Sequence, residues 1–151
     1  MQRFFATLRK SKFPHWRKSK GAEKVSVLLS LELEGLPPTV NHLYRNFRHW
    51  RYKTAFGRKY QEEVSSLLHN AWCDKPPNEN PVELRITFTT NNRRKWDVDN
   101  RVKALQDCLS MAGVLKDDRQ VEILHVERKY GVKNATYIEV ISIDTTERIS
   151  E

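Results

Sequence analysis

The clearest periodic pattern in this chain is a run of nine residues, VELRITFTT, at positions 82–90. Its apolar residues Val82, Leu84, Ile86 and Phe88 alternate with polar or charged ones. An alternation with a period of two is typical of a β-strand that buries one face and exposes the other. The pattern therefore predicts a sheet with one packed face, and other elements must cover that face.

Other segments of the chain can supply these elements. Runs of β-branched and large apolar residues predict three more strands, at residues 25–33, 121–130 and 135–143. Apolar residues spaced by three and four predict two helices, at about residues 56–72 and 97–112. The last two strands are separated by a short turn-like segment, which predicts a closing β-hairpin. The expected fold class is α/β (α+β), with one small mixed β-sheet covered by two main helices.

The length of 151 residues fits one compact domain. We expect that domain at residues 25–145, between a basic flexible arm at 1–24 and a short C-terminal tail at 146–151. The arm has seven Lys or Arg residues before Gly21 and no acidic residue before Glu23. It either adds affinity for nucleic acid through phosphate contacts, or is a solubilising extension, or is an organelle transit peptide.

The charge of the chain limits its partners. Lys and Arg outnumber Asp and Glu by 27 to 19, which gives a formal charge of +8 and favours a polyanion such as nucleic acid or an anionic membrane. No apolar stretch approaches the roughly 18 residues of a transmembrane helix, so none is expected. Cys73 and Cys108 are far apart and form no metal-binding spacing, which suits a reducing cytoplasm better than a disulfide framework.

Two acidic residues interrupt this basic chain in the segment KWDVDN, residues 95–100. Asp97 and Asp99 would diverge by roughly 200° within a regular helix, but they point the same way in an extended segment. If the change from extended to helical backbone falls between them, their carboxylates can converge at the helix N-terminus. The alternative is that either aspartate is an ordinary N-cap that complements the helix dipole.

A second acidic pair, Asp117 and Asp118, lies in a predicted turn before a strand, where aspartate is common for reasons of turn geometry. The intervening helix and turn could return Asp118 to the N-terminus of the helix that follows Asp97 and Asp99. Three carboxylates in one place repel one another unless a cation neutralises them. Oxygen ligands of this kind suit Mg²⁺ or Mn²⁺.

The string DVDNRVKALQDCLSMAGVLKDDRQV, residues 97–121, resembles the signature of the RusA family of Holliday junction resolvases, which are bacterial and phage endodeoxyribonucleases. The match combines D-x-D-N, a lysine four residues after the second aspartate, and D-D-x-Q-V at a fixed distance. The upstream strings LEGLPPTVNHLYR and TAFGRKYQEEV resemble the early turn and first helix of the family. Together these anchors span about residues 25–143.

The resemblance implies a homodimer that binds four-way DNA junctions and nicks two strands symmetrically with Mg²⁺. It places the acidic catalytic and metal-binding residues at Asp97, Asp99 and Asp118, and a functional lysine at Lys103. It also implies a cytoplasmic protein encoded by a bacterium or a phage. The chain departs from the best-known member at Trp96, where that member has arginine, so Trp96 either stacks on a base or packs within the protein.

The reaction expected from these residues is phosphodiester hydrolysis, in which one or two Mg²⁺ ions activate a water molecule. Lys103 would stabilise charge in the transition state or position the water. The alternative for Lys103 is an ion pair with Asp99, four residues before it, which would contribute about 0.3–0.5 kcal/mol. We expect Asp117 to form the turn and Asp107 to lie on the solvated face of the helix.

Basic and aromatic residues alternate in the segment TVNHLYRNFRHWRYKTAFG, residues 39–57, which we expect to be a loop. Such residues suit phosphate contacts and base stacking, although individual members can also be ordinary solvated side chains. The predicted DNA contacts are Asn41, Tyr44, Arg45, Arg48, Arg51, Lys53, Arg93, Arg94 and Lys95. Asn41 has a structural alternative, in which its side chain closes a turn. We expect Trp50 and Trp72 in the core.

Two other functions fit part of this pattern. A non-catalytic DNA-binding module would explain the charge and the aromatic segment, but it would leave the three aspartates as caps and turn residues. A metal nuclease that acts on other branched or single-stranded DNA would keep the site without the preference for four-way junctions. Cutting that depends on Mg²⁺ would distinguish the resolvase from a non-catalytic DNA-binding module. Dimerisation would distinguish it from a nuclease of other specificity, because symmetric nicks need two active sites related by a two-fold axis.

Overall fold

The computed structural model describes residues 6–7 and 26–143. The predicted arm at 1–24, apart from Ala6 and Thr7, and the predicted tail at 146–151 lie outside the described residues.

A mixed sheet forms one layer of the molecule. In the described part of the chain it has five strands in the order β1–β2–β7–β5–β6. These strands are β1 (Ala6–Thr7), β2 (Ser26–Glu34), β5 (Val82–Thr90), β6 (Val121–Tyr130) and β7 (Ala135–Ser142). Strands β5 and β6 are parallel, and the other neighbours are antiparallel.

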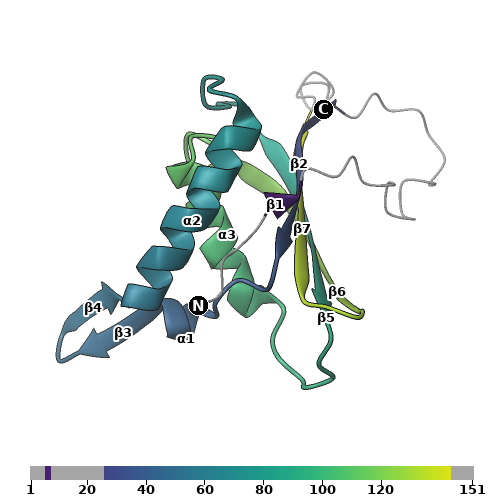
Figure 1. Ribbon diagram of the computed structural model, residues 1–151. Helices are drawn as coiled ribbons and strands as arrows, with labels where there is room; N and C mark the ends of the chain where they lie inside the picture. Colours follow the sequence, from purple (N-terminus) through teal and green to yellow (C-terminus); the bar gives the residue numbers. More distant parts are fainter. Residues whose placement is uncertain (1–5, 8–25, 144–151) are drawn as a thin grey trace, which may run out of the picture.

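Two helices, α2 (Ala55–Trp72) and α3 (Val102–Met111), lie on the same side of this sheet (Figure 1). The apolar residues of β5 that alternate in the sequence, Val82, Leu84, Ile86 and Phe88, are at most 1% exposed and belong to the core shared with these helices. Burial of one face of the strand follows from its period of two. The predicted fold class, one small mixed sheet covered by two main helices, is confirmed.

The predicted closing hairpin is wrong, because β6 and β7 do not pair and β5 lies between them. Thr89 of β5 lies opposite Ala135 of β7, while Thr90 lies opposite Tyr130 of β6. The segment 131–134 therefore passes over the end of β5, where the Gly131 N–H donates to the Thr90 carbonyl at 3.0 Å. Second-neighbour strands are about 10 Å apart, and four extended residues can span roughly 13 Å. A short linker consequently does not distinguish a hairpin from this crossing.

The parallel pair explains the position of α3. Parallel strands need a crossover connection, and here it consists of the 3₁₀ turn η2 (Asp99–Arg101), then α3, then a second 3₁₀ turn η3 (Asp118–Gln120). The predicted helix at 97–112 thus begins with a tighter turn. At its other end Gly113 has φ +71°, and the N–H groups of Gly113 and Val114 donate to the carbonyls of Ser110 and Leu109. This pattern is a Schellman C-cap, as the glycine predicted.

The segment expected to be a loop contains three short elements: α1 (Val40–Leu43), β3 (Tyr44–Phe47) and β4 (Trp50–Lys53). Strands β3 and β4 form a hairpin that extends beyond the start of α2, away from the main sheet (Figure 1). The prediction that Trp50 lies in the core is wrong: its side chain is 77% exposed on this hairpin. The same prediction for Trp72 is confirmed, since Trp72 is 6% exposed at the end of α2.

Candidate active site

Three elements carry the acidic residues singled out by the sequence. Asp97 lies in the connection after β5, Asp99 is the first residue of η2, and Asp118 is the first residue of η3. Asp97 and Asp99 are exposed. The N-cap positions of η2 and α3 are Val98 and Arg101, and neither helix start has a hydrogen bond from a capping side chain. Neither Asp97 nor Asp99 is therefore used as a side-chain cap.

Lys103, in the first turn of α3, contacts Asp118 of the second acidic motif and Asp107 of its own helix. Its Nζ lies 2.6 Å from Oδ2 of Asp118 and 2.9 Å from Oδ1 of Asp107. These hydrogen bonds, first that to Asp118 and then that to Asp107, raise the pKa of the Lys103 ammonium above its usual value. The alternative of an ion pair with Asp99 is not what the structure shows, because the described ion pairs of Lys103 are with Asp107 and Asp118.

The prediction that Asp107 lies on the solvated face of α3 is wrong. Only 19% of its side chain is exposed, because this face of the helix meets α2 and the base of the hairpin. Its Oδ2 accepts hydrogen bonds from the Tyr44 hydroxyl at 3.3 Å and from Nε2 of Gln61 at 3.4 Å. The sequence contained a signal only for the contact of Asp107 with Lys103, which stands four residues before it.

The residue types suit a divalent cation, but they are not gathered around one point. Carboxylate oxygens are the ligands that Mg²⁺ prefers in proteins. Within residues 6–7 and 26–143, however, no group of three or more His, Cys, Asp or Glu side chains is placed to hold one metal ion. Asp118 is held instead by the ammonium of Lys103. A metal ion shared by Asp97, Asp99 and Asp118 therefore stays a prediction.

Asp117 forms the turn, as expected. It is the N-cap of η3, where its side chain accepts from the backbone N–H of Arg119 and the side chain of Gln120 accepts from the backbone of Asp117. The guanidinium of Arg119 also donates to both carboxylate oxygens. These bonds from Arg119 hold the pKa of the Asp117 carboxyl well below its usual range. This capping box fixes the backbone from which Asp118 projects.

Trp96 packs within the protein. Its ring meets the ring of Phe88 edge-on at 5.7 Å, and the guanidinium groups of Arg101 and Arg128 lie 4.9 and 5.4 Å from its centre. An Nη1–H of Arg128 also donates to the Trp96 carbonyl at 3.1 Å. The indole consequently anchors the connection after β5 directly before Asp97.

The predicted DNA contacts fall on two separate parts of the chain. The first part is α1 with the β3–β4 hairpin, and it contains Asn41, Tyr44, Arg45, Arg48, Arg51 and Lys53. The second part is the connection after β5, and it contains Arg93, Arg94 and Lys95. Among the residues that the structure describes, none of the seven cations in these groups forms an ion pair with an acidic side chain. Their charges are thus available to an anionic partner.

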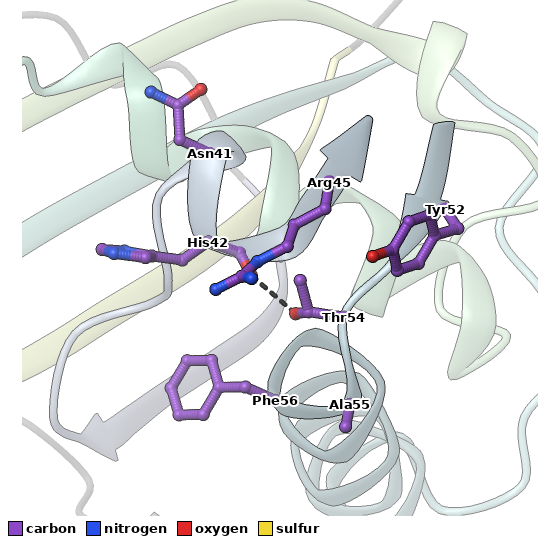
Figure 2. Close-up of a pocket in the computed structure, with 7 residues that line it drawn as sticks. All are labelled: Asn41, His42, Arg45, Tyr52, Thr54, Ala55 and Phe56. Atoms are coloured by element: carbon purple, nitrogen blue, oxygen red, sulfur yellow. Dashed lines mark hydrogen bonds between the residues drawn. The ribbon is translucent and has the colours of Figure 1, made fainter. Parts of the chain in front are cut away.

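A hollow of about 640 Å³ lies where the hairpin meets the start of α2. It is lined by Asn41, His42, Arg45, Tyr52, Thr54, Ala55 and Phe56 (Figure 2). Tyr52 and Phe56 are 49% and 53% exposed, which leaves their rings open to a planar partner. The sequence pattern identified Asn41 and Arg45 here but missed His42, Tyr52 and Phe56. The interleaving of aromatic and basic residues was the signal that could have found them.

Comparison with known proteins gives two results. Residues 34–141 match the model of the family described as Endodeoxyribonuclease RusA. The chain is also 38% identical over 85 residues to the crossover junction endodeoxyribonuclease RusA of Escherichia coli K12, covering 56% of this chain and 70% of that protein. Its similarity to the enzyme of the same name from Enterobacteria phage 82 is 35% identity, with the same coverage.

Proposed function

The chain belongs to the RusA family of endodeoxyribonucleases, and on this premise we propose that it is a Mg²⁺-dependent resolvase of Holliday junctions. As a homodimer it cuts two strands of a four-way junction symmetrically, in DNA recombination and repair. The names of its bacterial and phage relatives support the junction as substrate. Their origin supports a cytoplasmic enzyme encoded by a bacterium or a phage. Among the described helices, none is long and apolar enough to cross a membrane.

The observation that carries this proposal is the contact of 2.6 Å between Lys103 and Asp118. It places the first turn of the crossover helix, which follows the D-V-D-N motif, against the D-D-R-Q motif at the end of the crossover, 15 residues from Lys103. Neither Asp97 nor Asp99 has a capping bond there. A cap and a turn that served only the fold would not require a lysine beside Asp118.

In the proposed reaction, Asp97, Asp99 and Asp118 would hold Mg²⁺, or Mn²⁺ in its place. The bound ion would supply a water molecule of lowered pKa and neutralise charge on the phosphate. Lys103 remains beside the ion and stabilises the negative charge that develops on the attacked phosphate. Because Lys103 contacts Asp118, its ammonium would balance the charge of that carboxylate in the metal-free protein.

The seven cations that form no ion pair within the described part of the chain would contact the DNA. Arg45, Arg48, Arg51 and Lys53 bring the hairpin to one phosphate backbone, while Arg93, Arg94 and Lys95 contact phosphates next to the acidic residues. The hollow beside Arg45 has aromatic rings at its rim, which suit an unstacked base near the point where strands exchange.

The test is cleavage of an end-labelled synthetic four-way junction in Mg²⁺. Asp99→Asn and Asp118→Asn should each lower the cleavage rate by at least about 100-fold, because each removes a charged ligand of the proposed metal ion that would stabilise the reacting phosphate. Binding of the same junction in Ca²⁺ should stay unchanged. Asp117→Asn is the matched control, since asparagine also caps a helix and Asp117 is bonded to Arg119. Wild-type rates in both variants would contradict the proposal.

Two comparisons in the same assay separate the alternatives. A non-catalytic DNA-binding module would bind the junction and leave it uncut at every Mg²⁺ concentration. A metal nuclease of other specificity would cut a flap or a single strand faster than the four-way junction. The proposed resolvase cuts the junction into two nicked duplexes and leaves linear duplex intact.

A further inference from the structure

We infer that Asp107 is a positioning residue, which holds Lys103 against Asp118 and links this lysine to the β3–β4 hairpin through Tyr44. The inference rests on the proposed function, since it concerns the lysine of the proposed active site. It assigns a role to a carboxylate that is neither a proposed metal ligand nor a cap.

The contacts of Asp107 divide between its two oxygens. Oδ1 lies 2.9 Å from Nζ of Lys103. Oδ2 accepts from the Tyr44 hydroxyl and from Nε2 of Gln61. Gln61 belongs to α2 and is only 1% exposed, so it gives the carboxylate a rigid support. One oxygen is therefore fixed by the scaffold, and the other fixes the lysine.

Asp107 is more buried than the two residues with which it acts, Lys103 and Asp118. The side chain of Asp107 is 19% exposed, whereas those of Lys103 and Asp118 are 45% and 36% exposed. Asp107 is the inner anchor of the ammonium, and Asp118 is its outer partner. If a divalent cation binds Asp118, Asp107 keeps Lys103 beside the reacting phosphate. Without Asp107 the Lys103 ammonium would lose its second partner, and the side chain could adopt rotamers that extend into solvent.

The same carboxylate reaches the DNA-facing hairpin. Tyr44 is the first residue of β3, and the guanidinium of Arg51 on β4 lies 4.4 Å from the centre of its ring. The contacts run without a gap from Arg51 through Tyr44 and Asp107 to Lys103. A change in the position of the hairpin on binding DNA would move Tyr44 and therefore alter the support of Lys103. Coupling of this kind is measured by a double-mutant cycle.

The first test is Asp107→Asn, which keeps the shape of the side chain and removes its charge. We expect kcat for junction cleavage to fall about 10- to 100-fold, the range found when a residue that orients an active-site group is replaced. KM and binding in Ca²⁺ should stay near their wild-type values. Asp107→Glu should restore part of the rate, because it restores a carboxylate. Glu63→Gln is the matched control, since it removes another pair of a lysine with an acid four residues later, on α2.

The second test does not depend on cleavage. In the metal-free protein, the side-chain NMR signals of Lys103 should shift and indicate greater mobility in Asp107→Asn, but not in Glu63→Gln. Tyr44→Phe removes only a hydroxyl and should give a smaller loss of kcat. Its effect should not add to that of Asp107→Asn, because both act through one contact.

The outcomes distinguish this inference from the proposed function. If Asp118→Asn abolishes cleavage while Asp107→Asn cuts at the wild-type rate, the proposed function stands and the inference is overturned. Unchanged Lys103 signals in Asp107→Asn would also overturn it, whatever the rates. If the wild-type protein does not cut junctions at all, the proposed function fails, and the NMR comparison alone decides whether Asp107 positions Lys103.

Discussion

Asp107, Asp117 and Asp118 carry the same carboxyl group but contact different partners. Asp107 is supported from α2 and the hairpin, and Asp117 is bonded to the turn it caps. The ion pair of Asp118 within the described residues is with the half-exposed ammonium of Lys103. Asp118 is thus the carboxylate of the three that a cation can reach by displacing a single side chain. Residue type alone does not predict these differences, because each depends on what the fold places nearby.

The partners of Asp117 predict a dependence of stability on pH. Its pKa is lowered in the folded protein, chiefly by the side chain of Arg119, so the unfolded chain takes up a proton first as the pH falls. The stabilisation is complete above the unfolded pKa, at about pH 4, and is lost as the pH falls toward the folded pKa. Asp117→Asn keeps the cap but cannot titrate. Below about pH 4 its melting temperature should therefore fall less steeply than that of the wild type.

Thermal unfolding followed by circular dichroism between neutral and acidic pH measures this difference. Because the Asp117 side chain is 39% exposed, added salt should reduce this difference. Parallel curves for the two proteins at low salt would show that the bonds from Arg119 do not contribute to stability in solution.

At the scale of elements, the start of α2 connects the fold to the DNA-facing hairpin. The Thr54 hydroxyl accepts from the Gly57 N–H at 2.9 Å and donates to the His42 carbonyl at 2.6 Å (Figure 2). A Cβ on Gly57 would lie 2.9 Å from the Leu43 carbonyl oxygen, so only glycine lets α1 approach this closely. The cap of α2 thereby also fixes the wall of the hollow.

Replacement of Thr54 should affect both stability and DNA binding. Thr54→Ala removes an N-cap and should lower the free energy of unfolding by about 1 kcal/mol. It should also weaken junction binding in Ca²⁺, because α1, which leads into the hairpin, loses a side-chain hydrogen bond to the start of α2. Thr54→Ser keeps the hydroxyl and should behave like the wild type. Ser66→Ala, on the exposed face of α2, is the control for losing a hydroxyl within the helix. Urea unfolding and a junction-binding titration measure the two effects, and equal stability of all variants would contradict the role of Thr54.

The elements that the sequence predicted correctly are those with a strong local pattern. The alternation in β5 and the glycine after α3 each act through neighbours in the chain. The order of β5, β6 and β7 was not predictable in this way. A linker that joins paired strands in a hairpin and one that passes over the end of an intervening strand can have the same length. The β3–β4 hairpin was missed because its turn contains Arg48 at φ +54° and no glycine.

In the candidate site, too, local patterns in the sequence were predictive and contacts between distant residues were not. The D-V-D-N and D-D-R-Q strings locate the acidic residues and Lys103 within the sequence. The role of Asp107 was mispredicted, because its partners Tyr44 and Gln61 are 63 and 46 residues away and come from other elements. No spacing rule for a single helix contains such contacts.

At the scale of the whole molecule, each chain has one set of the proposed catalytic residues. The predicted DNA-contacting cations of each chain lie on its hairpin and on the connection that leads to its acidic residues, so one chain is suited to hold one strand for one cut. A four-way junction resolved symmetrically needs two cuts at positions related by a two-fold axis. The proposed homodimer would supply them, with one active site from each subunit.

Mixed dimers test whether each subunit makes one of the two cuts. A wild-type subunit and a tagged Asp118→Asn subunit are purified together and given a supercoiled plasmid that extrudes a cruciform. Two wild-type subunits should make both cuts in one binding event and yield linear plasmid. The mixed dimer has one intact site and should yield nicked circles, because the inactive subunit cannot make the second cut before the cruciform is reabsorbed. Linear product from mixed dimers at the wild-type yield would mean that one subunit makes both cuts, and a monomer in light scattering at working concentration would rule out the two-fold arrangement.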